Sequence, residues 1–189
     1  MEFPEIRINY PAWVEPSIDP DRRYGSDDEK IQLAIDLSRE NVVRDTGGPF
    51  GAAIFEAASN RLVAVGVNLV VPLNNCTLHG EMVAIMMAGA RLKSWTLAGE
   101  QMPRHELFTS CEPCAMCLGA TLWSGVKKLV FAATREDALR HDFDEGPVFP
   151  ESYAYLERRG IEIVRALGRE QANEVLDLYE ARRGPVYNG

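Results

Sequence analysis

Apolar residues recur along this chain with two different spacings, and the spacing predicts which segments are helices and which are strands. Behind the capping-box sequence "SDDE" at 26–29, apolar residues recur at helical spacing, so a helix is expected to about Thr46, before two glycines. The segments "FGAAIFEA" and "RLVAVGVNLV", separated by "ASN", are rich in strand-forming residues and predict a β-hairpin. Residues 1–25 are rich in proline and lack periodicity, which predicts an extended arm over the surface.

Helices and strands alternate in the rest of the chain. The segments "ELFTS", "PCAMCLGATLWS" and "KKLVFAAT" predict a β-α-β unit, which requires parallel strands. We therefore expect one domain over residues 1–189, built as a three-layer α/β/α sandwich with a mixed five-stranded sheet. The further predicted segments are a helix at 79–93, an acidic loop "HDFDEGP", a helix around 151–160, a strand at 161–167, a helix from about Arg169 to Arg182, and the tail "GPVYNG".

Composition and charge narrow the classes of protein that fit. The chain has 189 residues, of which 46% are hydrophobic and 25% charged, as in ordinary soluble domains. It carries no apolar run long enough to cross a bilayer, and its first residues do not have the pattern of a secretory signal. We therefore expect a cytoplasmic protein without a membrane partner. A net charge of −8 also argues against a nucleic-acid partner.

The stretch "TSCEPCAMCLG" contains the densest candidate chemistry. Cys114 and Cys117 stand three residues apart, and Pro113 suits the first position of a helix, so both sulfurs would share one helical face. The helix N-terminus stabilises thiolates there. A ferredoxin-like cluster would need a further cysteine at position 121, where this chain has Thr121. The remaining interpretations are a thioredoxin-like redox pair and a zinc site. Zinc requires at least one more protein ligand.

His79 is the candidate for that further ligand, because it opens the other helix that follows a loop. Glu81 lies two residues beyond it, and the two side chains can converge only at the first turn of a helix. Taken alone, His79 fits a surface or capping role as well as a ligand role. A His-x-Glu that opens one helix and a Pro-Cys-x-x-Cys that opens another are together typical of zinc-dependent nucleobase deaminases.

With these two motifs, residues 31–134 resemble the cytidine and deoxycytidylate deaminase superfamily. The resemblance implies one Zn²⁺ per subunit, held by His79, Cys114 and Cys117, with Glu81 as the catalytic proton shuttle. One departure from the family pattern is Gly80, where the family more often has alanine.

Within that superfamily the sequence is most similar to bacterial guanine deaminases, which hydrolyse guanine to xanthine and ammonia in purine catabolism. The similarity lies in a Gly-x-Asn strand end at 66–68, a Phe-Asp-Glu loop at 143–145, and a C-terminal helix with a tyrosine in its tail. It implies Glu145 as a second catalytic residue beside Glu81. The substrate-binding residues that we expect are Asn68, Phe50, His79, Trp95, Asp144 and Tyr187.

The resemblance also implies a homodimer, in which the helix and tail at about 169–189 swap between subunits and close the site of the partner. Because recognition would read a hydrogen-bond pattern, amino-triazines such as ammeline are expected as further substrates. The alternatives within the superfamily are a tRNA adenosine deaminase and a cytosine, cytidine or dCMP deaminase. A non-catalytic zinc-binding module and a thiol redox protein remain as alternatives from other classes.

Overall fold

The fold is described by a computed structural model that covers residues 3–187, so residues 1–2 of the expected arm and 188–189 of the expected tail lie outside the described residues. The strands are β1 (Gly51–Glu56), β2 (Arg61–Val67), β3 (His105–Cys111), β4 (Lys128–Ala133) and β5 (Glu162–Val164). The helices are α1 (Val14–Ser17), α2 (Asp27–Val43), α3 (Gly80–Leu92), α4 (Ala115–Ser124), α5 (Arg135–Arg140), α6 (Pro150–Arg158) and α7 (Arg169–Ala181).

The five strands form one mixed sheet, which confirms the fold class expected from the sequence. Their order is β2-β1-β3-β4-β5, with β1 antiparallel to both neighbours and β3, β4 and β5 parallel to one another. Because β1 is antiparallel to β2 and to β3, strands β2, β3 and β4 all run in one direction. Their carboxyl ends therefore meet at the same edge of the sheet, where ligand sites of open α/β sheets usually lie.

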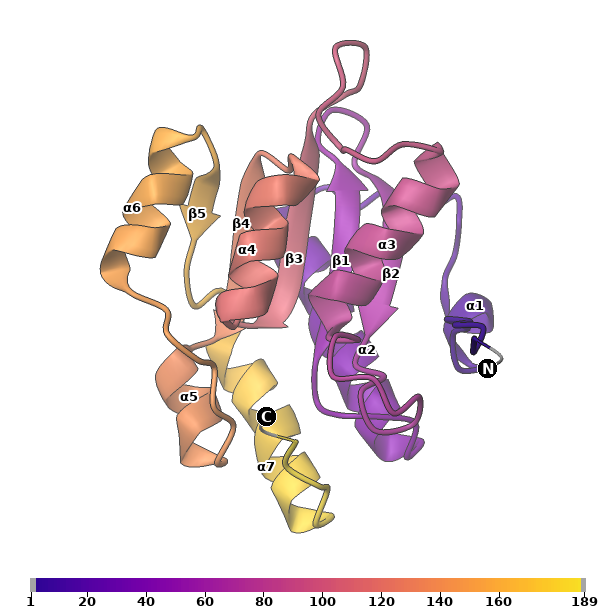
Figure 1. Cartoon of the computed structure of the whole chain (residues 1–189), viewed down its shortest axis with the longest axis vertical. Helices are drawn as coiled ribbons and strands as arrows, with labels where there is room; N and C mark the ends of the chain where they lie inside the picture. The colour runs from indigo at the N-terminus through magenta and orange to yellow at the C-terminus, as the bar shows by residue number, and fades with distance from the viewer. Residues whose placement is uncertain (1–2, 188–189) are drawn as a thin grey trace.

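Helices cover both faces of the sheet (Figure 1). One core lies between the sheet and helices α2 and α7, and it contains Phe55 and Phe108 from neighbouring strands. The other core lies between the sheet and helices α3, α4 and α6, and it contains Ile54 and Leu107. Successive residues of a strand point to opposite faces, so each central strand contributes to both cores. The result is the three-layer sandwich.

Several boundaries differ from those expected. The arm contains the one-turn helix α1, and α2 ends at Val43, three residues before the expected end. The predicted strand 161–167 shortens to β5, because Ala166 and Gly168 adopt left-handed backbone conformations that turn the chain into α7. Helix α5 was not predicted, although Thr134 and Asp137 form a capping box at its start.

Helix α7 is fixed to the body of the domain before the tail begins. The guanidinium of Arg169 donates two hydrogen bonds, of 2.7 and 2.9 Å, to the carboxylate of Asp137, whose side chain is fully buried. This bidentate pair lowers the pKa of Asp137. At the other end of α7, His141 Nδ1 lies 2.7 Å from a carboxylate oxygen of Glu180. These contacts determine where the tail after α7 starts. No helix within residues 3–187 combines the length and apolar character that a membrane span requires.

Helix α3 lies very close to β2 because Gly66 has no side chain. A Cβ atom at Gly66 would overlap the carbonyl oxygen of Gly80 and lie 2.5 Å from the backbone nitrogen of Ala84. Both are backbone atoms of the first turns of α3, so they cannot move without the helix. The start of α3 is therefore positioned by a glycine in the neighbouring strand.

We predict that Gly66→Ala lowers the free energy of unfolding by about 2–3 kcal/mol, because an added methyl group overpacks this contact. Urea unfolding at neutral pH measures the change. The matched control is Gly99→Ala, whose added Cβ would meet only the flexible side chain of Met102, at 3.4 Å. The control should stay within about 0.5 kcal/mol of the unmodified protein, as surface substitutions do. Equal stability of the two variants would contradict the close approach.

Candidate metal centre and active site

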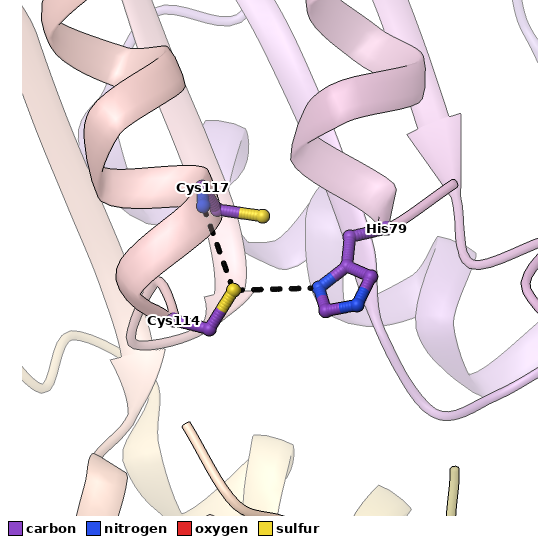
Figure 2. Close-up of side chains that lie close together, drawn as sticks. All are labelled: His79, Cys114 and Cys117. Atoms are coloured by element: carbon purple, nitrogen blue, oxygen red, sulfur yellow. Dashed lines mark hydrogen bonds between the residues drawn. The ribbon is translucent and has the colours of Figure 1, made fainter. Parts of the chain in front are cut away.

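The N-termini of α3 and α4 meet at the edge of the sheet where β2 and β3 end (Figure 2). His79 is the N-cap residue of α3, and Cys114 is the N-cap residue of α4. Cys117 follows one turn into α4, so its sulfur lies on the same side as that of Cys114. The ring nitrogen of His79 and the two sulfurs all lie within 4.8 Å of one another. The structure thus brings together the three residues expected as ligands.

The geometry of this triad fits a zinc ion. His79 Nδ1 lies 3.5 Å from Cys114 Sγ. A tetrahedral zinc with Zn–S of about 2.3 Å and Zn–N of about 2.0–2.1 Å separates a sulfur from a nitrogen ligand by about 3.5 Å. One imidazole and two thiols are also a donor set that suits zinc. The residues therefore need little movement to hold the ion.

The pKa values of the two thiols are shifted in opposite directions. Hydrogen bonds from the side chain of Cys117 and from His79 lower the pKa of Cys114 to about 4, against the effect of burial. The same contact with Cys114, together with burial, raises the pKa of Cys117 well above its usual value. The Cys117 backbone N–H also donates to Cys114 Sγ over 3.5 Å. The lowered pKa favours the thiolate form of Cys114 at the N-terminus of α4. The thiolate is the form in which cysteine binds a metal.

Glu81 lies inside the first turn of α3 and is 5% exposed. It lines the same small cavity as His79 and Cys114, so the two residues of the His-x-Glu motif do converge. Burial is the largest cause of the raised pKa of its carboxyl group. A raised pKa favours the protonated form of the carboxyl group more than in water, which suits a group that exchanges protons.

Gly80, between His79 and Glu81 in the chain, lies in a tightly packed position. A Cβ atom there would lie 3.2 Å from the carbonyl oxygen of Phe50, at the start of β1. The departure from the alanine of the family pattern therefore coincides with a close approach of α3 to β1.

Glu145 approaches the site from the loop between α5 and α6. Its carbonyl oxygen accepts a hydrogen bond of 2.9 Å from the backbone N–H of Ala115, so the loop crosses the N-terminus of α4. Its side chain lines the cavity, and burial is the main cause that raises its pKa to about 8. Asp144 also lines the cavity but is exposed, and its Oδ1 accepts from the N–H of Gly146.

Asn68 directly follows β2 and is completely buried. Its Nδ2 has no hydrogen-bond partner within residues 3–187, whereas its Oδ1 accepts from the N–H of Val70. A buried amide group without a partner costs about 1–3 kcal/mol. Its backbone is held by Asn41, whose Nδ2 donates to the carbonyl oxygens of Gly48 and Asn68, each over 2.9 Å. This donor is therefore unsatisfied, although Asn68 is not among the residues that line the cavity.

Three aromatic rings line the cavity together with the metal ligands His79 and Cys114. Phe50 packs edge-on against Phe143, with ring centroids 4.9 Å apart, and Tyr187 packs edge-on against Phe143 at 5.4 Å. The hydroxyl of Tyr187 is buried without a hydrogen-bond partner in the described part of the chain, and burial raises its pKa. The tail thus reaches the site of its own chain, and the cavity that remains measures about 30 Å³.

Trp95 does not lie at this site, contrary to our expectation. It follows the C-terminal end of α3 and is 93% exposed. His79 precedes the opposite end of that helix, and thirteen helical residues separate the two ends by about 20 Å. Trp95 is therefore withdrawn as a pocket residue of its own chain.

Glu112 is a site residue that the sequence did not reveal. Its carboxylate accepts hydrogen bonds from the Arg135 backbone N–H at 2.9 Å and from the Tyr153 hydroxyl at 2.7 Å. It thereby ties the loop before Cys114 to the start of α5 and to α6. Phe143 and Asn41 were also missed as supports of the site. The sequence feature that could have revealed Glu112 is a carboxylate next to the start of a helix.

Comparisons with known proteins agree with this geometry. A family model described as the cytidine and deoxycytidylate deaminase zinc-binding region matches residues 25–133. A guanine deaminase from Bacillus subtilis is 37% identical over 131 residues, which are 69% of this chain and 80% of the relative. A tRNA-specific adenosine deaminase from Buchnera aphidicola is 27% identical over 128 residues, 68% of this chain and 77% of the relative.

The solved structures give a longer match. The structure of a guanine deaminase from Nitrosomonas europaea, at 37% identity, superposes with a TM-score of 0.89 and covers 94% of this chain and 97% of its own. A structure in complex with 2,6-diaminopurine, at 38% identity, has a TM-score of 0.90 and covers 96% of both chains. These matches include the region after residue 133, where the family model ends.

We predict that Glu112→Ala weakens zinc binding by about tenfold, because the loop before Cys114 loses its support, as for residues that orient metal ligands. Competition with a chromogenic chelator measures the affinity. Tyr153→Phe, which removes one of the two hydrogen bonds, should have a smaller effect in the same direction. Unchanged zinc affinity in Glu112→Ala would show that the loop is held without this carboxylate.

Proposed function

This chain belongs to the cytidine and deoxycytidylate deaminase family, and we propose that within the family it hydrolyses guanine to xanthine and ammonia. The observation that carries the proposal is the superposition on a guanine deaminase over 94% of the chain, at a TM-score of 0.89. That superposition covers more of the chain than residues 25–133, which the family model matches. The net charge of −8 does not favour an RNA substrate.

We assign one zinc ion per chain to His79, Cys114 and Cys117, which the geometry of their donor atoms supports. Zinc bound by three protein ligands lowers the pKa of a water molecule in its open position and so supplies a nucleophile. The remaining chemistry falls to the side chains around it.

Glu81 is proposed to carry the protons of the reaction. Its carboxylate takes a proton from the attacking water and delivers it to the ring nitrogen next to the amino-bearing carbon. It then takes the second proton from the hydroxyl group now bonded to that carbon and gives it to the amino group, so that the carbon–nitrogen bond breaks, ammonia leaves and a carbonyl group forms. The burial of Glu81 supports this role, because a raised pKa favours the protonated form more than in water, which suits a group that exchanges protons.

Recognition of guanine is proposed to involve Asn68, Glu145 and Phe50. The unpartnered Nδ2 of Asn68 would donate to the purine carbonyl oxygen, which satisfies a donor that is otherwise buried alone. Glu145 would accept from ring N–H and amino groups, or relay a second proton. Phe50 lines the cavity and would stack on the base, while the exposed Asp144 contributes at the rim.

The tail is proposed to act as a lid. A cavity of about 30 Å³ holds a water molecule or two but no purine, so Tyr187 must move when a base enters. His79 would border the base from the metal side. We further propose that the enzyme is a cytoplasmic homodimer, in which the tail could close either its own site or that of the other subunit. The four cysteines are free thiols, which suits a reducing compartment.

A substrate screen tests the proposed function. We expect ammonia release from guanine to exceed that from cytosine, cytidine, dCMP, adenine and guanosine. Ammeline, which repeats the hydrogen-bonding edge of the guanine six-membered ring, should be hydrolysed more slowly. Preference for cytosine, or for adenosine within a tRNA anticodon stem-loop, would overturn guanine as the substrate. No release from ammeline would restrict the site to purines.

We predict that Glu81→Gln lowers kcat by about 10²–10⁴-fold, the usual contribution of a general acid–base, while the zinc content stays unchanged. Steady-state ammonia release and elemental analysis of the same sample measure the two quantities. Glu100→Gln, on an exposed loop, is the matched control and should retain full activity. A metal-loaded Glu81→Gln protein with full activity would refute the proton-carrier role.

A further inference from the structure

The N-terminal arm is connected to the candidate site by a chain of hydrogen bonds. Trp13, the N-cap residue of α1, donates from Nε1 to the hydroxyl oxygen of Thr46 over 2.9 Å. That hydroxyl donates to Oδ1 of Asn41 over 2.8 Å. Asn41 Nδ2 in turn donates to the carbonyl oxygens of Gly48 and Asn68, each over 2.9 Å. We call Trp13, Thr46 and Asn41 the arm network.

The direction of each hydrogen bond in the arm network is determined by its chemistry. An indole N–H only donates, so the Thr46 oxygen accepts from Trp13 and its own proton is available for Asn41. The Asn41 main-chain oxygen is a more distant acceptor, at 3.3 Å. The side-chain oxygen of Asn41 therefore faces Thr46, and the NH₂ group faces two carbonyl oxygens, which only accept. Trp13 thus helps to orient the amide of Asn41, which is completely buried.

Asn41 joins the two segments that hold the backbone of Phe50. The Phe50 N–H donates to the carbonyl oxygen of Gly48, and the Phe50 carbonyl oxygen accepts from the N–H of Asn68, each over 2.9 Å. Both acceptors of Asn41 therefore belong to backbone partners of Phe50, a residue that lines the cavity. Gly48 also contacts the tail, because a Cβ atom there would overlap the hydroxyl of Tyr187. A displacement of Asn41 would thus move Phe50 and Asn68 together.

The two segments approach each other so closely that position 47 has no room for a side chain. A Cβ atom at Gly47 would overlap the carbonyl oxygen of Asn68 and lie 2.6 Å from Nδ2 of Asn41. The glycine therefore allows the Asn41 amide to reach both of its acceptors. This packing leaves little space for the loop before β1 to adopt another position.

We propose that Trp13 and Thr46 are positioning residues for the base, and that they act through Asn41 on Phe50 and Asn68. The inference rests on the proposed function, in which Phe50 stacks on guanine and Asn68 donates to its carbonyl oxygen. Trp13 lies outside residues 25–133, so the arm contributes something that the family motifs do not contain. The arm network supports the loop before β1, whereas Glu81 lies on α3. It should therefore affect binding of the base more than the chemical step.

Steady-state kinetics of guanine deamination by the full-length zinc-loaded protein tests the positioning. Thr46→Val removes the hydroxyl group and keeps the branched shape. We expect it to raise KM for guanine about fivefold, the equivalent of one ordinary hydrogen bond, and to leave kcat within about twofold. Thr46→Ser retains a hydroxyl group and should restore the original KM. An unchanged KM in Thr46→Val, or a fall of kcat as large as the expected rise of KM, would overturn the positioning role.

Thr96→Val is the matched control. Thr96 is also half-buried, its hydroxyl oxygen accepts a hydrogen bond of 3.2 Å from the Ala98 N–H, and it lies beyond the end of α3 that is remote from His79. The same substitution there should leave KM and kcat unchanged. A KM that rises equally in the control would show a general effect of losing a threonine hydroxyl and would overturn the assignment.

A double-mutant cycle tests the contribution of the arm. Trp13→Phe keeps an aromatic ring but removes the N–H, so it should raise KM for guanine in the same direction, by about twofold to fivefold. Because Trp13 acts through the Thr46 hydroxyl, the double variant Trp13→Phe with Thr46→Val should be no weaker than Thr46→Val alone. Effects that multiply in the double variant, or no effect of Trp13→Phe, would overturn the connection between the arm and the site.

Amide hydrogen exchange without substrate, followed by NMR, separates this inference from the proposed function. We expect the N–H groups of Phe50 and Asn68 to exchange about fivefold faster in Thr46→Val and at the original rate in Thr96→Val. Unchanged exchange in Thr46→Val would overturn the arm network as a support, and faster exchange with an unchanged KM would overturn its role in binding the base. If the unmodified protein released no ammonia from guanine, the proposed function would fail, while the exchange rates would still decide whether the arm network holds these two residues.

Discussion

The structure depends on one constraint, namely that two helices begin at the same edge of the sheet within a few ångströms of each other. Strands β2 and β3 run in the same direction, so the loops that follow them lead to α3 and α4 at one edge. Gly66 and Gly80 allow α3 to approach β2 and β1 closely. Only because of this close packing does an imidazole from one helix lie 3.5 Å from a sulfur of the other.

The site contains several groups whose burial lowers the free energy of unfolding. Two buried carboxyl groups line a cavity of about 30 Å³, and Asn68 carries a buried amide without a partner. These groups would be more stable in water or with a partner, whereas the lowered pKa of Cys114 shows that its thiolate is stabilised in place. Such local departures are expected where a protein binds a ligand, and here they coincide with the family motifs.

Much of the fold and of the metal centre could be predicted from the sequence, because the information is local. The periodic segments predicted the sheet, and the spacing of Cys114 and Cys117 with the helix start at His79 predicted the ligands. Glu112 stands next to a helix start, which is a local signal, but its partners Arg135 and Tyr153 lie far away in the chain. The same is true of Asn68, a partner of Asn41. Trp95 was placed wrongly, although the helix predicted at 79–93 already puts it at the opposite end from His79.

The central claim is that His79, Cys114 and Cys117 together hold one zinc ion. X-ray absorption at the zinc edge of the protein as purified tests it most directly, since it reports the identity and distance of the ligands. The account predicts two sulfurs at about 2.3 Å, with nitrogen or oxygen ligands at about 2.0–2.1 Å. A shell of four sulfurs, a shell without sulfur, or a protein without bound metal would contradict it.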